Sequence, residues 1–316
     1  MVHCNHAARA DRLPYVYIAG AGYSGSTLLA FLLNAHPQMV STSEVEGPTP
    51  DVNLQEYRCS CGALLLRCPF FLTLERRIKV LGSEFALTNW QTSFQLSEYR
   101  LLDIVFARTL RSSLLDQCRD VLVPFVPGYT RTVATISRRM VHFAQAVLAI
   151  SGKHVFVDAQ KDSERIKFLS HIEEFDLKVI HLVRDVRGAV ASRMKHAARN
   201  DPAWATRKWC TANLNVERAK RYVASDHWLR VTYSDLCATT QGTLDRIADF
   251  VGVQRVPVCE NVYDGEHHII GNQMRLKNAA PIQEDQSWKR LLSDRDLAVI
   301  ARIGGAINRY FGHPWP

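Results

Sequence analysis

The sequence has no long apolar run, no repeat at a fixed period and no block of like charges. No stretch approaches the roughly 20 apolar residues that a membrane-spanning helix needs, which argues against an integral membrane protein. The first 14 residues contain no apolar run and do not resemble a secretory signal. The lysines and arginines never form a run of five or more, so their distribution gives no special indication of a nucleic acid partner.

The composition is that of an ordinary soluble globular protein. Of 316 residues, 47% are apolar and 22% are charged, so the chain can bury a large core as one large domain or two small ones. The net charge of +8 favours an anionic partner. Eight cysteines in a chain of this length, without a secretory signal, favour reduced thiols and a cytoplasmic location.

Residues 15–44 predict a strand, a glycine-rich turn and a helix. Residues 15–19 are β-branched, aromatic or small, as in a buried strand. Three glycines follow before an apolar run over residues 28–33, and Pro37 disfavours helix beyond about Asn34. This arrangement points backbone N–H groups and the positive end of a helix dipole at one place, where a phosphate or sulfate can bind.

The turn lacks the lysine of a nucleotide-triphosphate P-loop. Gly20 and Gly25 have the spacing of the motif G-x4-G-K-[ST], but Ser26 stands where the motif has lysine. Without that cation nothing in the loop reaches the β- and γ-phosphates of ATP, which argues against an ATPase or kinase. The alternative is a turn that only connects the strand to the helix.

Strands alternate with helices along the chain, which predicts an α/β fold with a central parallel sheet between two helical layers. The expected strands are residues 15–19, 39–43, 154–158, 178–183 and 227–232. Ligands of this fold class bind beyond the carboxyl ends of the strands. The most informative positions therefore follow the strands directly: Tyr23 to Thr27, Glu44, Lys161, Arg184 and Tyr233.

Arg184 and Ser192 form a second candidate anion site. Arg184 follows the clearest strand, and Ser192 lies eight residues later on an expected helix, so that both can face one crevice. Arginine binds phosphate through a fork of donors, and a serine hydroxyl adds one more. Two phosphate sites at one sheet edge indicate a nucleotide phosphorylated at two positions. Alternatively, Arg184 forms an ion pair with Asp185 or another carboxylate.

We expect a single domain over residues 1–316 with two additions. Residues 1–13 predict a loose N-terminal arm. Residues 48–150 predict a mainly helical insertion or lid on the acceptor side, with helical periodicity in residues 101–115 and 140–150.

Three cysteines of this insertion are close in sequence: Cys59, Cys61 and Cys68. They could bind a metal or form a disulfide, but three thiols fall short of the four ligands of a structural zinc site. We therefore favour a loop with buried thiols and expect no metal.

Four stretches, in this order, resemble the sulfotransferases that use 3′-phosphoadenylyl sulfate (PAPS), most closely the bacterial and tyrosylprotein-type branches. Residues 23–29 resemble the family's 5′-phosphosulfate loop, and residues 184–192 resemble its 3′-phosphate motif R-D-P-R-x4-S. Residues 231–252 resemble its Y-E-D-L segment with the apolar positions that follow. Residues 267–275 resemble a C-terminal stretch of many bacterial members.

The resemblance implies a P-loop NTPase-like fold and a role for each matching residue. Arg184 and Ser192 would hold the 3′-phosphate, and Tyr233 would lie near the nucleotide. Asn272 and Arg275 would also contact the nucleotide. The glycine loop would hold the 5′-phosphosulfate through these residues: Gly22, Tyr23, Ser24, Gly25, Ser26, Thr27 and Leu28.

The resemblance also implies the catalytic pair. Glu44 matches the glutamate base of tyrosylprotein and several bacterial sulfotransferases, and Lys161 matches the lysine that stabilises the bridging and sulfuryl oxygens. No metal would be required. Glu46 is the second choice of base. Otherwise Glu44 caps a helix or pairs with a cation, and Lys161 is a surface lysine.

Two residues depart from the family pattern: Val186 replaces the proline of the 3′-phosphate motif, which is a mild change, and the departure at Tyr23 is the more important. Tyr23 stands where the loop usually has arginine or lysine, and it keeps a hydroxyl donor without a positive charge. Either Lys161 and Arg275 supply the missing charge, or the sulfate binds differently.

We therefore predict an enzyme that moves the sulfuryl group of PAPS to a hydroxyl, or alternatively an amine, and leaves the 3′,5′-bisphosphate PAP. The alternatives are an atypical P-loop kinase and a non-catalytic anion- or nucleic-acid-binding module. The acceptor class stays open among small molecules, carbohydrates and lipids, and the sequence does not indicate an oligomeric state.

Overall fold

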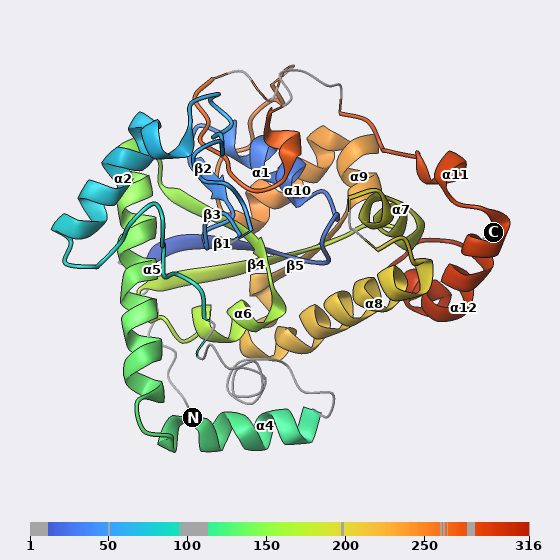
Figure 1. Ribbon diagram of the computed structural model, residues 1–316, viewed down its shortest axis with the longest axis horizontal. Coiled ribbons are helices and arrows are strands. Elements are labelled where there is room, and N and C mark those ends of the chain that lie inside the picture. The colour runs from blue at the N-terminus through green and yellow to red at the C-terminus, as the bar shows by residue number, and fades with distance from the viewer. Residues whose placement is uncertain are drawn as a thin grey trace.

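Figure 1 shows the computed structural model, which describes residues 12–49, 51–94, 96, 113–196, 199–259, 261, 263, 265–276 and 282–315. Five strands in this part of the chain form one parallel sheet in the order β2-β3-β1-β4-β5. They are β1 (Leu13–Ala19), β2 (Met39–Ser43), β3 (Val155–Lys161), β4 (Phe175–Val183) and β5 (Trp228–Thr232). The predicted α/β fold with a central parallel sheet is confirmed.

The α-helices of the described residues connect and cover these strands. They are α1 (Ser26–Asn34), α2 (Pro69–Val80), α4 (Ser113–Leu122), α5 (Tyr129–Ser151), α6 (Ser163–Leu169), α7 (Val186–His196), α8 (Pro202–Ala219), α9 (Tyr233–Ala238), α10 (Thr240–Val251), α11 (Trp288–Leu291) and α12 (Asp294–Tyr310). Figure 1 shows α1 and α10 above the sheet and α6 and α8 below it, which gives three layers.

Strand β1 lies at the centre of the sheet and is buried on both faces. Val16 and Ile18 pack into a core cluster with helices α1 and α10. Tyr15 and Tyr17 point to the other face and pack into the cluster that contains helix α5. Because helices cover both faces, the strand has apolar or aromatic residues at every position between Tyr15 and Ala19 rather than an apolar–polar alternation.

Helix α1 begins and ends where the sequence predicts. Gly25 is its N-cap, and its last residue is Asn34. All nine of its residues are buried, because the helix lies between the sheet and α10. The helix therefore fixes the glycine loop rigidly against the sheet.

The segment 48–150 is mainly helical in its described part, and much of it belongs to the core. Met140 and Phe143 of α5 are fully buried and share a core cluster with Phe156 of the sheet. Helix α4 lies away from the sheet, at the bottom of Figure 1. The lid role stays a prediction, and the predicted helix over 101–112 and the predicted arm over 1–11 lie outside the described residues.

Two irregularities in the sheet lie at the carboxyl ends of the strands. The pairing of β1 with β3 shifts register between Tyr17 and Ala19, and that of β2 with β3 shifts between Ser41 and Ser43. Ser43 and Lys161 have positive φ angles of 66° and 81°. Such bulges turn the following side chains away from the regular pleat, and they are common next to functional sites.

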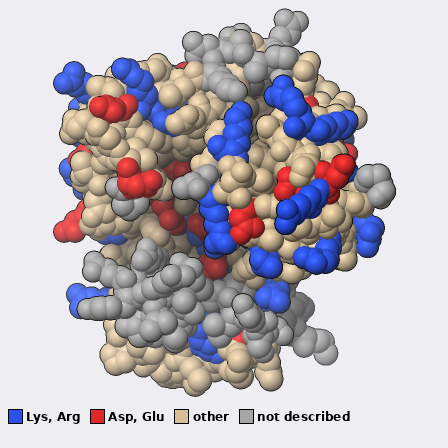
Figure 2. Space-filling view, turned by 45° about the vertical axis from the view of Figure 1, so that its right-hand side comes forward, with Lys and Arg blue, Asp and Glu red and all other residues tan. Residues whose placement is uncertain are grey.

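No helix among the described residues is both long and apolar enough to cross a membrane. On the face drawn in Figure 2, lysine and arginine side chains are interspersed with acidic and neutral ones. The net positive charge is thus spread over this face rather than gathered in one basic surface.

A buried arginine joins the sheet to the segment after β2. Arg165 on α6 has a side chain that is 2% exposed, and it donates hydrogen bonds to Glu46 at 2.6 Å and Asp158 at 3.3 Å. Tyr15 donates a further hydrogen bond to Asp158 at 2.7 Å. Burial lowers the pKa of Arg165, but the attraction of Asp158 and Glu46 outweighs it and raises the pKa above its usual value. The two carboxylates therefore balance the charge of the buried guanidinium, although Arg165 Nε has no hydrogen-bond partner among the described residues.

We predict that Arg165→Met strongly destabilises the fold. The substitution leaves the Asp158 carboxylate buried without its cation, which typically costs about 3–5 kcal/mol of unfolding free energy. Urea denaturation followed by circular dichroism measures the change. Lys79→Ala is the control, because the exposed Lys79–Glu75 pair is expected to contribute less than about 1 kcal/mol. Equal stability of the two variants would contradict the prediction.

Candidate functional site

The carboxyl ends of neighbouring strands bring the predicted site residues to one edge of the sheet. The glycine loop leaves β1, and Gly20 donates its N–H to the carbonyl of Lys161 at the end of β3, at 3.2 Å. Glu44 follows β2, and Arg184 follows β4. Residues separated by more than 100 positions in sequence therefore meet at the place where ligands bind in this fold class.

The glycines of the loop allow close packing that a side chain would prevent. A Cβ atom on Gly20 would lie 2.4 Å from the carbonyl oxygen of Leu182 in β4. A Cβ atom on Gly25 would lie 2.4 Å from Cδ2 of Tyr233, and Gly25 also has a left-handed φ of 96°. The loop is consequently held between β4 and the ring of Tyr233.

The start of helix α1 is open to an anion. The helix has no side-chain cap and no acidic residue in its first turn. The first N–H groups of a helix have no partner within the helix, and the helix dipole adds positive potential at that end. The hydroxyl oxygen of Ser24 is buried without a hydrogen-bond partner within the described part of the chain. A phosphate oxygen would satisfy both sets of donors.

Arg184 and Ser192 come together as the sequence suggests. The guanidinium of Arg184 donates to the Ser192 hydroxyl at 3.2 Å and to the carbonyl of Tyr23 in the glycine loop at 3.3 Å. Its Cζ atom lies 4.5 Å from the centre of the Tyr233 ring. Trp209 donates a hydrogen bond to the Arg184 carbonyl at 3.0 Å. The second candidate anion site is thus adjacent to the first.

A carboxylate already contacts this arginine, and it is not that of Asp185. Arg184 donates to the side chain of Asp285 at 3.1 Å and to its carbonyl at 2.9 Å, whereas Asp185 pairs with Arg187 at 2.7 Å. Burial raises the pKa of Asp285, but hydrogen bonds from Ser287 and Arg184 outweigh it and lower the pKa. Arg184 therefore forms an ion pair, as the alternative interpretation of the sequence predicts. Its partner is Asp285, which lies 101 positions away in the sequence.

Arg193 on helix α7 places a cation beside the glycine loop, and the sequence analysis missed it. Its guanidinium carbon lies 5.2 Å from the centre of the Tyr23 ring, and a Cβ atom on Gly22 would lie 2.9 Å from its Nη2 atom. Burial lowers the pKa of Arg193. The only signal in the sequence was its position directly after Ser192 on the same helix. Arg193 places positive charge next to Tyr23, whose own side chain brings none.

Glu44 and Lys161 form an ion pair at the end of the sheet. Lys161 Nζ lies 2.6 Å from Glu44 Oε1 and 3.3 Å from the carbonyl of Ala159. The side chains of Glu44 and Lys161 are 21% and 20% exposed, so a ligand can reach both. Gly271 approaches Glu44 closely, since a Cβ atom there would lie 2.6 Å from the carboxyl carbon.

Glu46, the second choice of base, has a structural partner instead. Its carboxylate accepts a hydrogen bond from the buried Arg165 at 2.6 Å. Burial raises the pKa of Glu46, while the charge of Arg165 opposes that shift. The two glutamates are almost equally exposed, at 22% for Glu46 and 21% for Glu44, but Glu46 pairs with the buried Arg165 and Glu44 pairs with the partly exposed Lys161. The choice of Glu44 as the base stays a prediction.

Arg275 contacts residues 57 and 58 as well as its own segment, whereas Asn272 bonds within its own segment. Arg275 donates to the carbonyl of Arg58 at 2.9 Å and to that of Gly271, and its guanidinium stacks on Tyr57 with Cζ 4.1 Å from the ring centre. Asn272 accepts a hydrogen bond from the N–H of Met274 at 2.9 Å. The contact of these two side chains with a nucleotide stays a prediction.

The three cysteines of the sequence analysis lie close to a histidine. Cys59, Cys61 and Cys68 have free thiols. Their sulfur atoms and a ring nitrogen of His268 all lie within 4.8 Å of one another. Sequence reasoning missed His268 as a member of this group because 200 positions separate it from Cys68.

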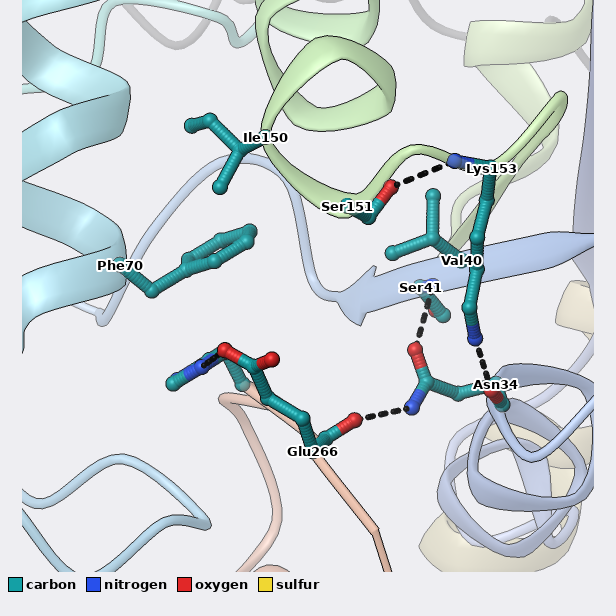
Figure 3. Close-up of a pocket in the computed structure, with 9 residues that line it drawn as sticks. Asn34, Val40, Ser41, Phe70, Ile150, Ser151, Lys153 and Glu266 are labelled. Atoms are coloured by element: carbon teal, nitrogen blue, oxygen red, sulfur yellow. Dashed lines mark hydrogen bonds and ion pairs between the residues drawn. The ribbon is translucent and has the colours of Figure 1, made fainter. Parts of the chain in front are cut away.

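A small pocket lies at the far end of helix α1, away from the glycine loop (Figure 3). Its volume is about 60 Å³, and its lining includes Asn34, Phe70, Lys153 and Glu266. The nine-residue helix places it about 13 Å from the loop at 1.5 Å per residue. Asn34 bridges the pocket by hydrogen bonds to Ser41 at 3.1 Å and to the Glu266 carbonyl at 3.2 Å. The pocket is therefore separate from the anion sites.

Comparison with known proteins identifies the family. Residues 14–257 match a sequence model described as "Sulfotransferase family". The sulfotransferase domain of the Synechococcus PCC 7002 olefin synthase has a similar structure, with a TM-score of 0.52, 21% identity and coverage of 97% of each chain. The sulfotransferase domain from the curacin biosynthetic pathway gives a TM-score of 0.53 and 17% identity, over 96% of this chain and 100% of that one. No curated protein sequence matches the chain significantly.

We predict that Gly25→Ala destabilises the protein more than Gly82→Ala does. Both glycines have φ near +90°, where an alanine costs about 1–2 kcal/mol. Gly25 also faces Tyr233, whereas no atom of the described residues lies within 4 Å of a Cβ atom on Gly82. Thermal denaturation of the two variants separates the steric clash from the backbone strain. Equal melting temperatures would show that Tyr233 does not confine the loop.

Proposed function

The chain belongs to the sulfotransferase family, and we propose that it transfers the sulfuryl group of PAPS to a hydroxyl of an acceptor. The observation that carries the proposal is the contact of Arg184 with Ser192 at 3.2 Å, directly beside the glycine loop. A site with two adjacent groups of anion donors suits a nucleotide with phosphates at both its 3′ and 5′ positions.

The residues present fit the two phosphates. The glycine loop offers the N–H groups at the start of α1 for the 5′-phosphosulfate, together with the Ser24 hydroxyl, which has no hydrogen-bond partner among the described residues. Arg184 and Ser192 offer a guanidinium and a hydroxyl for the 3′-phosphate. Charge-assisted hydrogen bonds from arginine are about twice as strong as neutral ones, which makes Arg184 the principal anchor.

The ring of Tyr233 lies between the glycine loop and Arg184. It packs on Gly25 and against Arg184. Burial raises the pKa of Tyr233 to about 12, so its hydroxyl stays protonated at neutral pH and remains a hydrogen-bond donor.

We assign the chemistry to the Glu44–Lys161 pair. When bound, PAPS supplies the sulfuryl group. Glu44 accepts the proton of the acceptor hydroxyl, and the 2.6 Å contact with Lys161 orients its carboxylate. Lys161 and Arg193 supply positive charge for the oxygens of the sulfuryl group and its bridge, which compensates for the uncharged Tyr23. A carboxylate base suits a hydroxyl acceptor, with an amine as the alternative.

The acceptor belongs to a small-molecule, carbohydrate or lipid class in this proposal. Trp90 and Phe94 of the insertion are only 2% and 4% exposed, whereas Phe125 of the same segment is 81% exposed. Trp90 and Phe94 therefore contribute to the core rather than to a surface for the acceptor.

We predict that PAP raises the melting temperature and that Arg184→Ala weakens PAP binding. The loss of a hydrogen bond to a charged group costs about 1.5–3 kcal/mol, which is roughly a 10- to 100-fold weaker affinity. Arg184→Lys should recover only part of it, because lysine lacks the fork of donors. Calorimetric titration with PAP measures the affinities, with the exposed Arg255→Ala as the control.

Two results would contradict this assignment. Stabilisation by ATP with magnesium but not by PAP would favour an atypical kinase. Oligonucleotide binding with a steep salt dependence, and no affinity for PAP, would favour a non-catalytic anion-binding module.

We predict that Glu44→Gln spares PAP binding and lowers turnover about 10²- to 10⁴-fold, the usual contribution of a general base. Glutamine keeps the size of the side chain but cannot accept the proton. Transfer of labelled sulfate from PAPS to a panel of hydroxyl acceptors measures turnover, with the exposed Glu56→Gln as the control. Unchanged turnover in Glu44→Gln would reject Glu44 as the base.

A further inference from the structure

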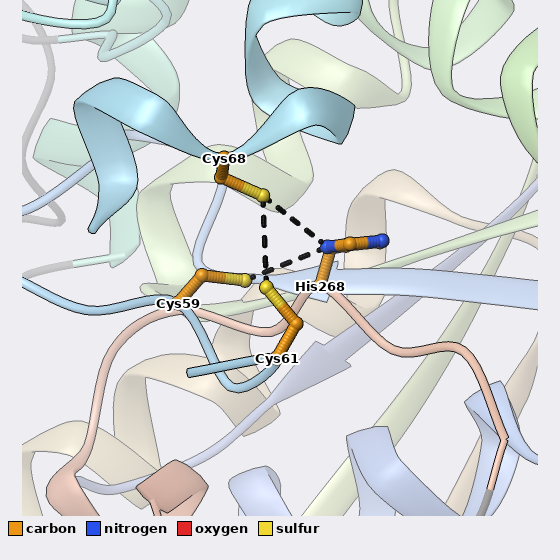
Figure 4. Close-up of side chains that lie close together, drawn as sticks. All are labelled: Cys59, Cys61, Cys68 and His268. Carbon is orange, nitrogen blue, oxygen red and sulfur yellow. Dashed lines mark hydrogen bonds between the residues drawn. The ribbon is translucent and has the colours of Figure 1, made fainter. Parts of the chain in front are cut away.

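Three cysteines and one histidine point their ligand atoms at a common centre (Figure 4). His268 Nδ1 lies 3.6 Å from the sulfur of Cys59 and 3.4 Å from that of Cys68. The sulfurs of Cys61 and Cys68 are 3.7 Å apart. The side chains come from three separate parts of the chain: the loop after Tyr57, the start of helix α2 and the segment before Gly271.

These separations are those of a tetrahedral zinc site. Zinc binds thiolate sulfur at about 2.3 Å and imidazole nitrogen at about 2.0–2.1 Å. Tetrahedral angles then place two sulfurs about 3.8 Å apart and a sulfur about 3.5 Å from a nitrogen. A disulfide would instead need sulfurs about 2.05 Å apart, far shorter than the 3.7 Å between Cys61 and Cys68.

The local backbone holds the two loop cysteines in a tight turn. Gly62 donates its N–H to the Cys59 carbonyl at 2.9 Å, and Cys59 donates to the Ala63 carbonyl at 2.9 Å. Gly62 has a left-handed φ of 87°, which a glycine adopts without strain. Cys68 is the N-cap of α2, where Pro69 follows as the first helical residue. Main-chain hydrogen bonds therefore hold these positions independently of any metal.

The histidine is oriented like a metal ligand. His268 places Nδ1 toward the sulfurs, while its Nε2 lies 3.0 Å from Glu266 Oε1. A carboxylate on the second ring nitrogen fixes the tautomer in which the first nitrogen keeps its lone pair, a common arrangement around zinc. Phe70 stacks on the imidazole at 4.4 Å between ring centres and stops it from rotating.

We propose that Cys59, Cys61, Cys68 and His268 bind one Zn²⁺ ion in a closed tetrahedral site. Four protein ligands leave no open position for water or substrate, so the ion stabilises structure and does not take part in chemistry. Three thiolates and one imidazole favour zinc over magnesium, calcium or manganese, which prefer oxygen ligands. Three cysteines alone suggested no metal; the fourth ligand becomes visible only in the folded chain.

The ion would stabilise the segment 267–271, which lies on one side of Glu44. Ser60, between two of the ligands, accepts a hydrogen bond from Ile269 N–H at 2.7 Å and donates to the His267 carbonyl at 3.1 Å. Two residues further on, Gly271 lies against the Glu44 carboxylate. Loss of zinc should therefore loosen the segment 267–271 and disturb Glu44. Zinc binding itself does not depend on the proposed sulfuryl transfer.

The test is the metal content of the full-length protein, purified without chelators and measured by inductively coupled plasma mass spectrometry. We expect about one zinc per chain, reduced to background in Cys61→Ser and His268→Ala. Cys61 is exposed, so its replacement should leave the fold intact. Cys118→Ser and Cys259→Ser, which replace exposed cysteines elsewhere, should keep the zinc.

A second variant changes a residue that is not one of the proposed zinc ligands. Glu266→Ala removes the partner of His268 from a side chain that is 84% exposed, and it should weaken zinc affinity about 10- to 100-fold in a competition with a chromophoric chelator. Glu173→Ala, another exposed glutamate, is the control and should leave the affinity unchanged.

Substitution of Co²⁺ for zinc tests the coordination geometry of the site. Replacement of zinc by Co²⁺ should produce thiolate charge-transfer bands and the intense visible bands of a tetrahedral site, both absent in Cys61→Ser. Zinc at background level in the unmodified protein would overturn the proposal. So would a Cys61–Cys68 disulfide found by mass spectrometry, or full zinc retention in both ligand variants.

Discussion

The candidate anion site depends on the contacts that the Arg184 guanidinium makes. It contacts the Tyr23 carbonyl in the glycine loop and the Ser192 hydroxyl on α7, and it lies against the ring of Tyr233. The space for it exists because residue 188 is glycine: a Cβ atom there would lie 2.8 Å from Arg184 Nε. Since arginine keeps its charge at any physiological pH, this largely buried cation needs an anion beside it. In the structure that anion is Asp285, and a phosphate would have to displace the carboxylate or share the guanidinium with it.

Two sets of charged groups around β2, β3 and α6 have different surroundings. Arg165, Asp158 and Glu46 are linked to one another, and the arginine and aspartate are almost wholly buried. Glu44 and Lys161 pair at 2.6 Å and remain about one fifth exposed. Arg165 and Asp158 can act only on the structure around them, because no ligand can reach their side chains. The exposed pair is held in position by that structure and is free to act on a ligand.

The segment 267–271 connects features that seemed unrelated in the sequence. It contributes His268 to the cysteine cluster, Ile270 to a backbone hydrogen bond with Thr42 at 3.0 Å, and Gly271 to the wall beside Glu44. The segment thereby connects the cysteine cluster with the end of β2. Only a few backbone residues separate the cysteine cluster from Glu44. A structural change in the cluster can therefore alter the position of the Glu44 carboxylate.

The sequence by itself determined the elements and the local motifs. The bounds of β2 and the end of α1 at Asn34 were predicted, because apolar patterning, Pro37 and Gly25 act within a few residues. Arg184 and Ser192 were paired from their spacing of eight on a strand and the helix after it. Only the tertiary structure decided which partners meet across long separations: Asp285 at Arg184, Arg193 at Tyr23, and His268 at the cysteines. Such contacts depend on strand order and on the path of the C-terminal segment, which local patterns do not encode.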